Sequence, residues 1–310
     1  MPELTTPAGA TVAYQTFGRS SSPPMLLIQG LGAQMIGWRD EFCHILAAEG
    51  FHVIRFDNRD VGLSQSYPEG GYRLSDMAND SAALLAGLAA FPAHVVGQSM
   101  GGMIAQLLAV NQPEFVASLG LVYTTADLRH AIGEDLVSDR LEAPAPLDRA
   151  EYVAAYVAGE EACASRDYPQ DTAWLAELGA QMYARNPRID GAARQVHAIY
   201  AEPPWAPTLE RIDVPSVIIA GDSDRLIDPA ASFDLFRLIP GSRLSIIPGM
   251  GHELPRTCWP LIARLLTDNC RRAAARADGD YAPSPLPVTG ADFAGPEDRA
   301  TRVAASRRTR

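Results

Sequence analysis

The stretch from Ala93 to Gln106, Ala-His-Val-Val-Gly-Gln-Ser-Met-Gly-Gly-Met-Ile-Ala-Gln, constrains the fold more than any other part of the chain. A short apolar run ends at Gly97, and helix-forming residues begin directly after Ser99. This pattern predicts a buried strand that turns sharply into a helix, with Gly97 and Gly101 where a Cβ atom would not fit. The turn strains the backbone at Ser99 and projects its hydroxyl from the sheet edge. Because glycine-rich loops also match Gly-x-Ser-x-Gly by chance, the rest of the chain must supply partners for the serine.

Buried-strand patterns alternate with helical patterns along most of the chain. A weak alternation over 11–17 predicts an antiparallel edge strand, and the other runs are typical of strands buried on both faces of a parallel sheet. We therefore expect an α/β fold with a mostly parallel, doubly wound sheet, in which ligands bind beyond the carboxyl ends of the strands. The predicted buried strands lie at 25–29, 52–56, 93–97, 118–123, 215–220 and 243–247.

The pattern changes between residues 126 and 207, where helical segments separated by prolines replace the strands. We interpret 126–207 as a helical cap inserted into a core made of 1–125 and 208–276. Residues 277–310 are rich in Pro, Gly, Ala and Arg without periodicity, so we expect a disordered tail. The cap carries seven large rings, which are Tyr152, Tyr156, Tyr168, Trp174, Tyr183, Tyr200 and Trp205.

Charge and composition narrow the classes of partner. The net charge of −11 argues against nucleic acid and anionic membranes as partners. No apolar run approaches the roughly 20 residues that a membrane span needs, and the N-terminal residues lack a secretory pattern. The four cysteines are widely spaced and predict neither a metal site nor disulfides. We expect a cytoplasmic monomer or small homo-oligomer that acts on a small molecule without a cofactor or metal.

Two further residues follow predicted strands directly and can partner the serine. Asp224 comes after the strand at 215–220, and His252 lies in a Gly-x-Gly-His turn after the strand at 243–247. The order Ser99, Asp224, His252 matches one known arrangement of a catalytic triad. In such a triad the histidine accepts the serine proton, while the acid fixes the imidazole tautomer and stabilises the imidazolium.

The acid of the triad has alternatives. Asp222 or Asp228 could serve instead, or Asp224 could merely cap the following helix. We favour Asp224 for its position. The other histidines lie on predicted helix faces or at strand starts, where structural roles are the usual ones.

An oxyanion formed during attack on a carbonyl needs two backbone N–H donors. One is the amide of Met100, directly after the serine, and the second is the amide of Leu31 in the loop after the strand at 25–29. We also expect Gly30, and Tyr200 and Trp205 at the end of the cap, to contact the substrate.

Five motifs together resemble the branch of the α/β-hydrolases that contains the aclacinomycin methylesterases. They are Gln-Gly-Leu-Gly-Ala-Gln, Arg-Phe-Asp-Asn-Arg-Asp-Val-Gly-Leu-Ser, Gly-Gln-Ser-Met-Gly-Gly, Gly-Asp-Ser-Asp and Ile-Pro-Gly-Met-Gly-His-Glu-Leu-Pro. The resemblance covers residues 10–270 in outline and includes Asp60, where most hydrolases have Gly. It is weak in the cap. It implies the α/β-hydrolase fold and an esterase activity; the family members cleave a methyl ester on an anthracycline, an aromatic polyketide.

We therefore predict a serine esterase that works through an acyl-enzyme. A perhydrolase or cofactor-free haloperoxidase could use the same triad with peroxide as acyl acceptor. A catalytically inactive ligand-binding protein is the alternative from another class, although such proteins usually lose a triad residue. Epoxide hydrolase and dehalogenase chemistry is disfavoured, because both use Asp at the position of Ser99.

Overall fold

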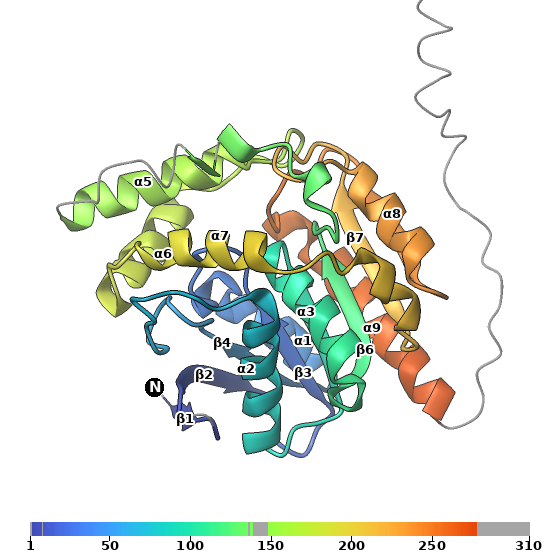
Figure 1. Ribbon diagram of the computed structural model, residues 1–310. Coiled ribbons are helices and arrows are strands. Elements are labelled where there is room, and N and C mark those ends of the chain that lie inside the picture. The colour runs from blue at the N-terminus through green and yellow to red at the C-terminus, as the bar shows by residue number, and fades with distance from the viewer. Residues whose placement is uncertain (1, 8, 136, 139–147, 278–310) are drawn as a thin grey trace, which may run out of the picture.

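A central sheet of eight strands organises the computed structural model (Figure 1), which describes residues 2–7, 9–135, 137–138 and 148–277. The strand order is β1-β2-β4-β3-β5-β6-β7-β8, and all neighbours from β4 to β8 run parallel. This arrangement confirms the predicted α/β fold with a mostly parallel, doubly wound sheet. The strands are β1 Glu3–Thr5, β2 Thr11–Phe17, β3 Pro24–Ile28, β4 His52–Phe56, β5 Ala93–Gln98, β6 Val116–Val122, β7 Ser216–Gly221 and β8 Arg243–Ile247.

One sheet prediction was wrong. β2 is antiparallel to its neighbours, as expected, but it is not the edge strand. β1 pairs outside it, with Glu3 opposite Ala13. Three residues are too few to show a strand periodicity, so this pairing depends on the neighbouring strand.

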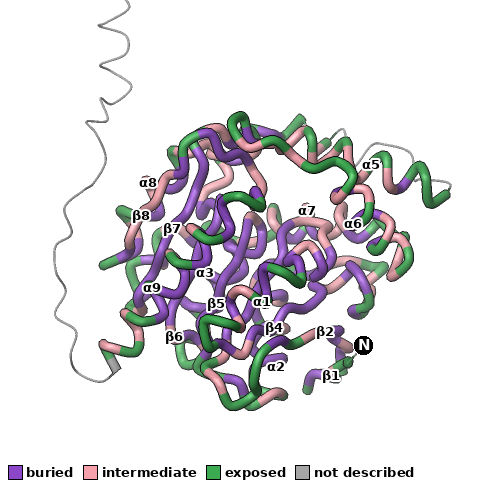
Figure 2. The backbone as a smooth tube through the Cα atoms, turned by 180° about the vertical axis from the view of Figure 1, so that it is seen from behind, coloured by how far each residue is buried: buried purple, intermediate pink, exposed green. Residues whose placement is uncertain are grey.

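Helices cover both faces of the sheet, and each face has its own apolar cluster. α2, α3 and α8 pack on one face, while α1 and α9 pack on the other. Figure 2 shows the strands buried between these two helical layers. The helices of the core are α1 Asp40–Ala48, α2 Leu74–Gly87, α3 Met100–Asn111, α8 Ala230–Leu238 and α9 Trp259–Ala277, with the short 3₁₀ turns η1 Met35–Gly37, η2 Pro113–Phe115 and η5 Arg256–Cys258.

The chain order reverses at the centre of the sheet, between β3 and β5. From β3 the chain proceeds to β4 on one side, and from β5 it proceeds through β6 to β8 on the other. In doubly wound sheets such a reversal opens a crevice at the carboxyl ends of the strands. The loop after β3 and the turn after β5 are therefore neighbours at the sheet edge where doubly wound folds generally bind ligands.

The segment between β6 and β7, which we call the cap, contributes no strand to the sheet among its described residues. A small cluster joins Met35 and Ile36 of η1 to Tyr152, Leu178 and Met182 of the cap. Its helices are η3 Leu128–His130, α5 Arg149–Ala162, α6 Thr172–Arg185, α7 Gly191–Ala201 and η4 Ala206–Arg211.

The predicted tail lies, after Ala277, outside the described residues. Among the helices that are described, none is both long enough and apolar enough to cross a membrane.

Candidate active site

Ser99 sits in a sharp turn between β5 and α3. Its backbone has φ 53° and ψ −125°, a left-handed conformation that non-glycine residues rarely adopt. A Cβ atom at Gly97 would overlap the carbonyl of Gly101, and one at Gly101 would overlap the carbonyl of Ile28. The two glycines are thus required by close packing of the turn against itself and against β3.

The structure brings Ser99, His252 and Asp224 together. Ser99 Oγ lies 2.9 Å from His252 Nε2, and Asp224 Oδ2 lies 2.8 Å from His252 Nδ1. Only 8% of the His252 side chain and 2% of the Asp224 side chain are exposed. Because a carboxylate can only accept, the Nδ1 proton lies toward Asp224 and Nε2 can accept the serine proton.

Asp224 contacts His252 and the turn that follows β7, and it does not cap α8, which begins at Ala230. Its Oδ2 faces His252, while its Oδ1 accepts hydrogen bonds from the amides of Leu226 and Ile227 at 2.8 and 3.0 Å. The two alternative acids are bound elsewhere: Asp222 Oδ1 accepts from the Gly249 amide at 2.6 Å, and Asp228 Oδ1 from the first amide of α8 at 2.8 Å. The geometry therefore favours Asp224 as the acid.

Two of the other histidines pair with residues outside the candidate triad. His94 is buried and pairs with Ser118 at 2.9 Å, and burial lowers the pKa of its imidazole to about 4. His130 pairs with Asp234 of α8 at 2.8 Å. Both lie in contacts that do not include Ser99.

The two amides predicted to bind an oxyanion belong to the elements that flank Ser99. Met100 begins α3, so its amide lies at the positive end of the helix dipole. Leu31 lies in the loop after β3, and a Cβ atom at Gly30 in that loop would approach the Ser99 Cβ to 3.2 Å. Within the described part of the chain, neither amide donates a hydrogen bond to another residue. Both donors are thus available beside the serine.

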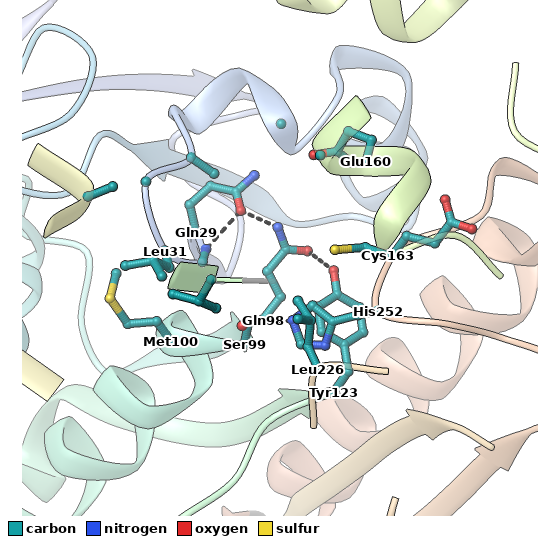
Figure 3. A pocket seen from close by; sticks show the side chains of 18 of the residues that line it. Gln29, Leu31, Gln98, Ser99, Met100, Tyr123, Glu160, Cys163, Leu226 and His252 are labelled. Atoms are coloured by element: carbon teal, nitrogen blue, oxygen red, sulfur yellow. Dashed lines mark hydrogen bonds between the residues drawn. The ribbon is translucent and has the colours of Figure 1, made fainter. Parts of the chain in front are cut away.

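Three polar residues that sequence reasoning did not place lie beside the serine. Tyr123 Oη donates to Gln98 Oε1 at 2.5 Å, Gln98 Nε2 donates to Gln29 Oε1, and that oxygen also accepts the Gly30 amide at 2.9 Å. Figure 3 shows this chain of hydrogen bonds next to Ser99. The only signal for them in the sequence is that each lies at or directly after the end of a buried strand.

A cavity of about 430 Å³ opens above Ser99 and His252, between the core and the cap. Most of its wall consists of apolar and aromatic side chains. The rings come from cap and core alike, and include Tyr152, Tyr156, Trp174 and Tyr200 from the cap with Trp38 and Trp259 from the core. Gly30, Leu31 and Met100 line it as well.

The expected substrate contact of Trp205 was wrong. Its side chain is only 5% exposed and packs in the apolar cluster around α2 and α3, away from the cavity wall. The indole N–H donates to Gln106 Oε1 at 2.9 Å, which anchors the end of the cap to α3. A buried indole N–H usually takes a hydrogen-bond acceptor, and for Trp205 that acceptor lies in the core. Tyr200, by contrast, is 61% exposed and lies at the cavity.

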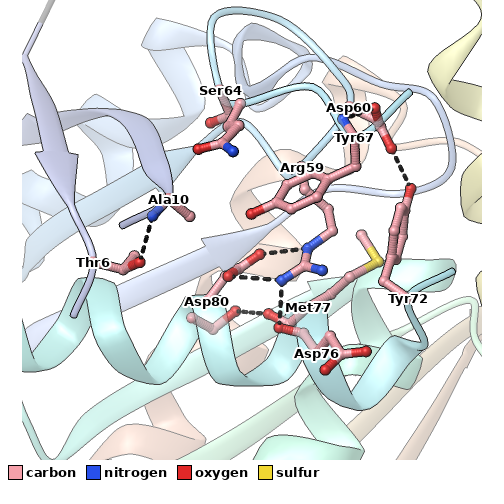
Figure 4. Close-up of polar contacts among 12 residues, drawn as sticks. Thr6, Ala10, Arg59, Asp60, Ser64, Tyr67, Tyr72, Asp76, Met77 and Asp80 are labelled. Carbon is pink, nitrogen blue, oxygen red and sulfur yellow. Dashed lines mark hydrogen bonds and ion pairs between the residues drawn. The ribbon is translucent and has the colours of Figure 1, made fainter. Parts of the chain in front are cut away.

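Two buried carboxylates in the loop after β4 fasten the cap to the core. Arg185 at the end of α6 pairs with Asp57, and Arg194 of α7 pairs with Asp60, each at 2.8 Å. Asp60 also accepts from the Tyr72 hydroxyl at 2.7 Å (Figure 4). Two of the helices that line the cavity, α6 and α7, are therefore joined to the core by ion pairs.

The family model of the alpha/beta hydrolase fold matches residues 23–255. The chain belongs to the α/β-hydrolase family. Rhodomycin D methylesterase of Streptomyces sp. strain C5 is 30% identical to this hydrolase over 288 residues, which cover 85% of this chain and 96% of the methylesterase. These matches confirm the predicted family and the predicted likeness to methylesterases.

Solved structures of similar shape support the same assignment. A hydrolase from Pseudomonas aeruginosa PA01 is 26% identical, with a TM-score of 0.68 and coverage of 86% of this chain and 97% of that one. The enol-lactonase of Burkholderia xenovorans LB400 shares the fold, with 21% identity and a TM-score of 0.71. The superposition covers 87% of this chain and 100% of the enol-lactonase.

Proposed function

We propose that this carboxylic ester hydrolase uses Ser99 as its nucleophile and hydrolyses an ester of a bulky, largely apolar acid with a small alcohol. One observation carries the proposal. The hydrogen-bonded chain of Ser99, His252 and Asp224 ends at the wall of an aromatic cavity that the cap completes.

Acylation follows from these contacts. Ser99 Oγ attacks the ester carbonyl carbon as its proton passes to His252 Nε2, and the imidazolium is stabilised by Asp224. The carbonyl oxygen becomes an oxyanion, which the amides of Leu31 and Met100 bind. When the tetrahedral intermediate collapses, the bond to the alcohol oxygen breaks and His252 returns its proton to that oxygen.

Deacylation repeats the steps with water. His252 removes a proton from water, the hydroxide attacks the acyl carbon, and the same two amides bind the second oxyanion. Collapse breaks the bond to Ser99 Oγ, which takes the proton back from His252. The acid leaves and the free enzyme is restored.

The shape and lining of the cavity support the substrate class. Its volume is within the range of roughly 300 to 1,000 Å³ typical of small-molecule sites. Each 100 Å² of apolar surface that a ring system buries contributes about 2.5 kcal/mol. We propose Gly30 and Tyr200 as substrate contacts and a methyl ester of an aromatic polyketide as a fitting substrate. The methylesterase relative supports this class.

Ser99→Ala is expected to abolish measurable ester hydrolysis while the fold is kept. Loss of a triad nucleophile typically lowers kcat by about 10⁴-fold or more. The measurement is hydrolysis of p-nitrophenyl acetate, with circular dichroism to verify folding and a fluorophosphonate probe to label the wild-type serine. Retention of more than a tenth of wild-type activity would show that Ser99 is not the nucleophile.

The acyl preference tests the substrate class separately. We expect kcat/KM to rise along the methyl esters of acetate, benzoate and a fused tricyclic acid, because larger rings bury more apolar surface in the cavity. A steady fall along the same series would mean that the cavity does not admit large acyl groups, and the polyketide ester would then be abandoned.

A further inference from the structure

The loop after β3 offers a single amide to the site. The Gly30 amide donates to Gln29 Oε1 at 2.9 Å, and the Gly32 amide donates to Gln195 Oε1 at 2.8 Å. Between them, the Leu31 amide has no acceptor among the described residues. The peptide that carries the proposed oxyanion donor is thus held on both sides by a glutamine side chain.

The orientation of the Gln29 amide follows from a chain of donors. The Gly30 N–H can only donate, so Gln29 must present its oxygen. That oxygen accepts Gln98 Nε2, which turns the Gln98 oxygen toward the Tyr123 hydroxyl. Burial raises the pKa of Tyr123 well above its ordinary value, so the hydroxyl keeps the proton that it donates. Figure 3 shows the three side chains in line.

The Gln195 amide is oriented by a different partner. Its Nε2 donates to the carbonyl of Arg59 at 2.8 Å, and because that carbonyl can only accept, the oxygen of Gln195 faces the Gly32 amide. Gln195 is fully buried, and it comes from α7 of the cap. The cap therefore contacts the loop that carries the proposed oxyanion donor.

We propose that Gln29 and Gln195 are positioning residues that hold the Leu31 amide where the oxyanion forms, one from the core and one from the cap. The inference rests on the proposed function, because it needs an oxyanion at Ser99. Tyr123 and Gln98 act one step further away, by setting the orientation of Gln29. The cap thus completes the catalytic geometry as well as the cavity.

Three buried glutamines provide a matched test. Gln29→Met and Gln195→Met remove an acceptor from the loop, whereas Gln106→Met removes a comparable buried amide outside the site. Gln106 is fully buried, accepts from Trp205 Nε1 and donates to the carbonyl of Thr125 at 3.2 Å. All three substitutions leave buried partners unsatisfied, so their cost in stability should be similar, and only the first two should change catalysis.

The assay separates oxyanion binding from substrate binding. Hydrolysis of p-nitrophenyl acetate gives kcat and KM, and phenylboronic acid serves as a tetrahedral transition-state analogue on Ser99. For Gln29→Met and Gln195→Met we expect kcat to fall about 10- to 100-fold, less than the loss on removing an oxyanion donor outright. The inhibition constant of the boronate should rise by a similar factor while KM stays within about twofold.

Tyr123→Phe tests the outer part of the chain without removing apolar volume. It keeps the ring beside the His252 imidazole, whose centroid lies 4.6 Å away, and deletes only the hydroxyl. We expect the same signature at about 3- to 10-fold, since Gln29 keeps its other contacts. If Gln29→Met fails to fold, Tyr123→Phe together with Gln195→Met carries the test.

Two results would overturn the proposal. The first is that kcat and the boronate affinity of Gln29→Met and Gln195→Met stay within about twofold of the values for Gln106→Met. The second is that these two variants change only KM. A wild-type enzyme inhibited by the boronate, with Ser99→Ala inactive, would show that the proposed function survives such a failure. Turnover retained in Ser99→Ala would instead overturn both proposals.

Discussion

Replacing Arg194 by methionine is expected to loosen the junction between the cap and the core. Arg194 on α7 pairs with Asp60 at 2.8 Å, with the Asp60 side chain fully buried and that of Arg194 15% exposed. Burial alone would raise the pKa of Asp60, but hydrogen bonds from Arg194, the Tyr67 amide and the Tyr72 hydroxyl lower it below its ordinary value. The variant removes the one cationic donor of this set.

The expected loss is about 2 to 3 kcal/mol of unfolding free energy. Removing one partner of a buried ion pair typically costs roughly 3 to 5 kcal/mol, because the other charge is left uncompensated. The cost is lower here because Asp60 keeps the Tyr67 amide at 2.8 Å and the Tyr72 hydroxyl at 2.7 Å. For a chain of this size that loss lowers the melting temperature by roughly 3 to 5 °C.

The lowered pKa of Asp60 determines how the stability difference between wild type and Arg194→Met changes with pH. A carboxyl whose pKa is lowered by folding stabilises the protein above its unfolded pKa of about 3.9, and this contribution is lost as the pH falls through the folded pKa. In Arg194→Met the pKa of Asp60 rises, so protonation relieves the uncompensated charge. The gap in stability between wild type and variant should therefore be largest near pH 7 and narrow toward about pH 3.

Urea unfolding followed by circular dichroism at several pH values measures the gap. Arg237→Met is the matched control, because its ion pair with Asp234 on α8 has side chains that are 72% and 42% exposed. Exposed pairs contribute little, so this variant should resemble the wild type. A gap for Arg194→Met no larger than the control's, or one that stays constant with pH, would refute the reasoning.

Two further predictions concern the acid of the triad and the C-terminal segment. Asp224→Asn should lower kcat by about 10⁴-fold. Asp222→Asn and Asp228→Asn should be milder, because each keeps an oxygen that can accept from the Gly249 or Ala230 amide. Steady-state kinetics rank the three variants, and a reversed order would reassign the acid. A chain ending at Ala277 should keep its melting temperature and activity, since the sequence beyond shows no apolar periodic face; a loss of several degrees or of most activity contradicts this.

Short-range patterns were sufficient for the strands other than β1 and for the candidate triad. The turn at Ser99 is specified by two glycines four positions apart, and the buried strands are short, largely apolar runs. Asp224 and His252 follow their strands directly, so parallel pairing alone carries both to the same edge of the sheet. These features depend on local backbone sterics and burial, which the order of residues determines.

Contacts between distant segments were decided only by the tertiary structure. The sequence predicted that the Trp205 ring would line the cavity. In the structure its indole N–H instead donates to Gln106 in the core, 99 residues earlier in the chain. Gln29 meets Gln98 across 69 residues, and Gln195 reaches the Gly32 amide across 163.

The physical reason is that the residues next to a polar side chain in the sequence do not indicate which group it will hydrogen-bond. An amide can donate or accept, and which it does is settled when burial removes water and leaves one compatible neighbour. The sequence by itself therefore determined where the proposed nucleophile, base and acid would lie together. The packing of the cap on the core decided which side chains surround them, and which backbone amide remained free to face the substrate.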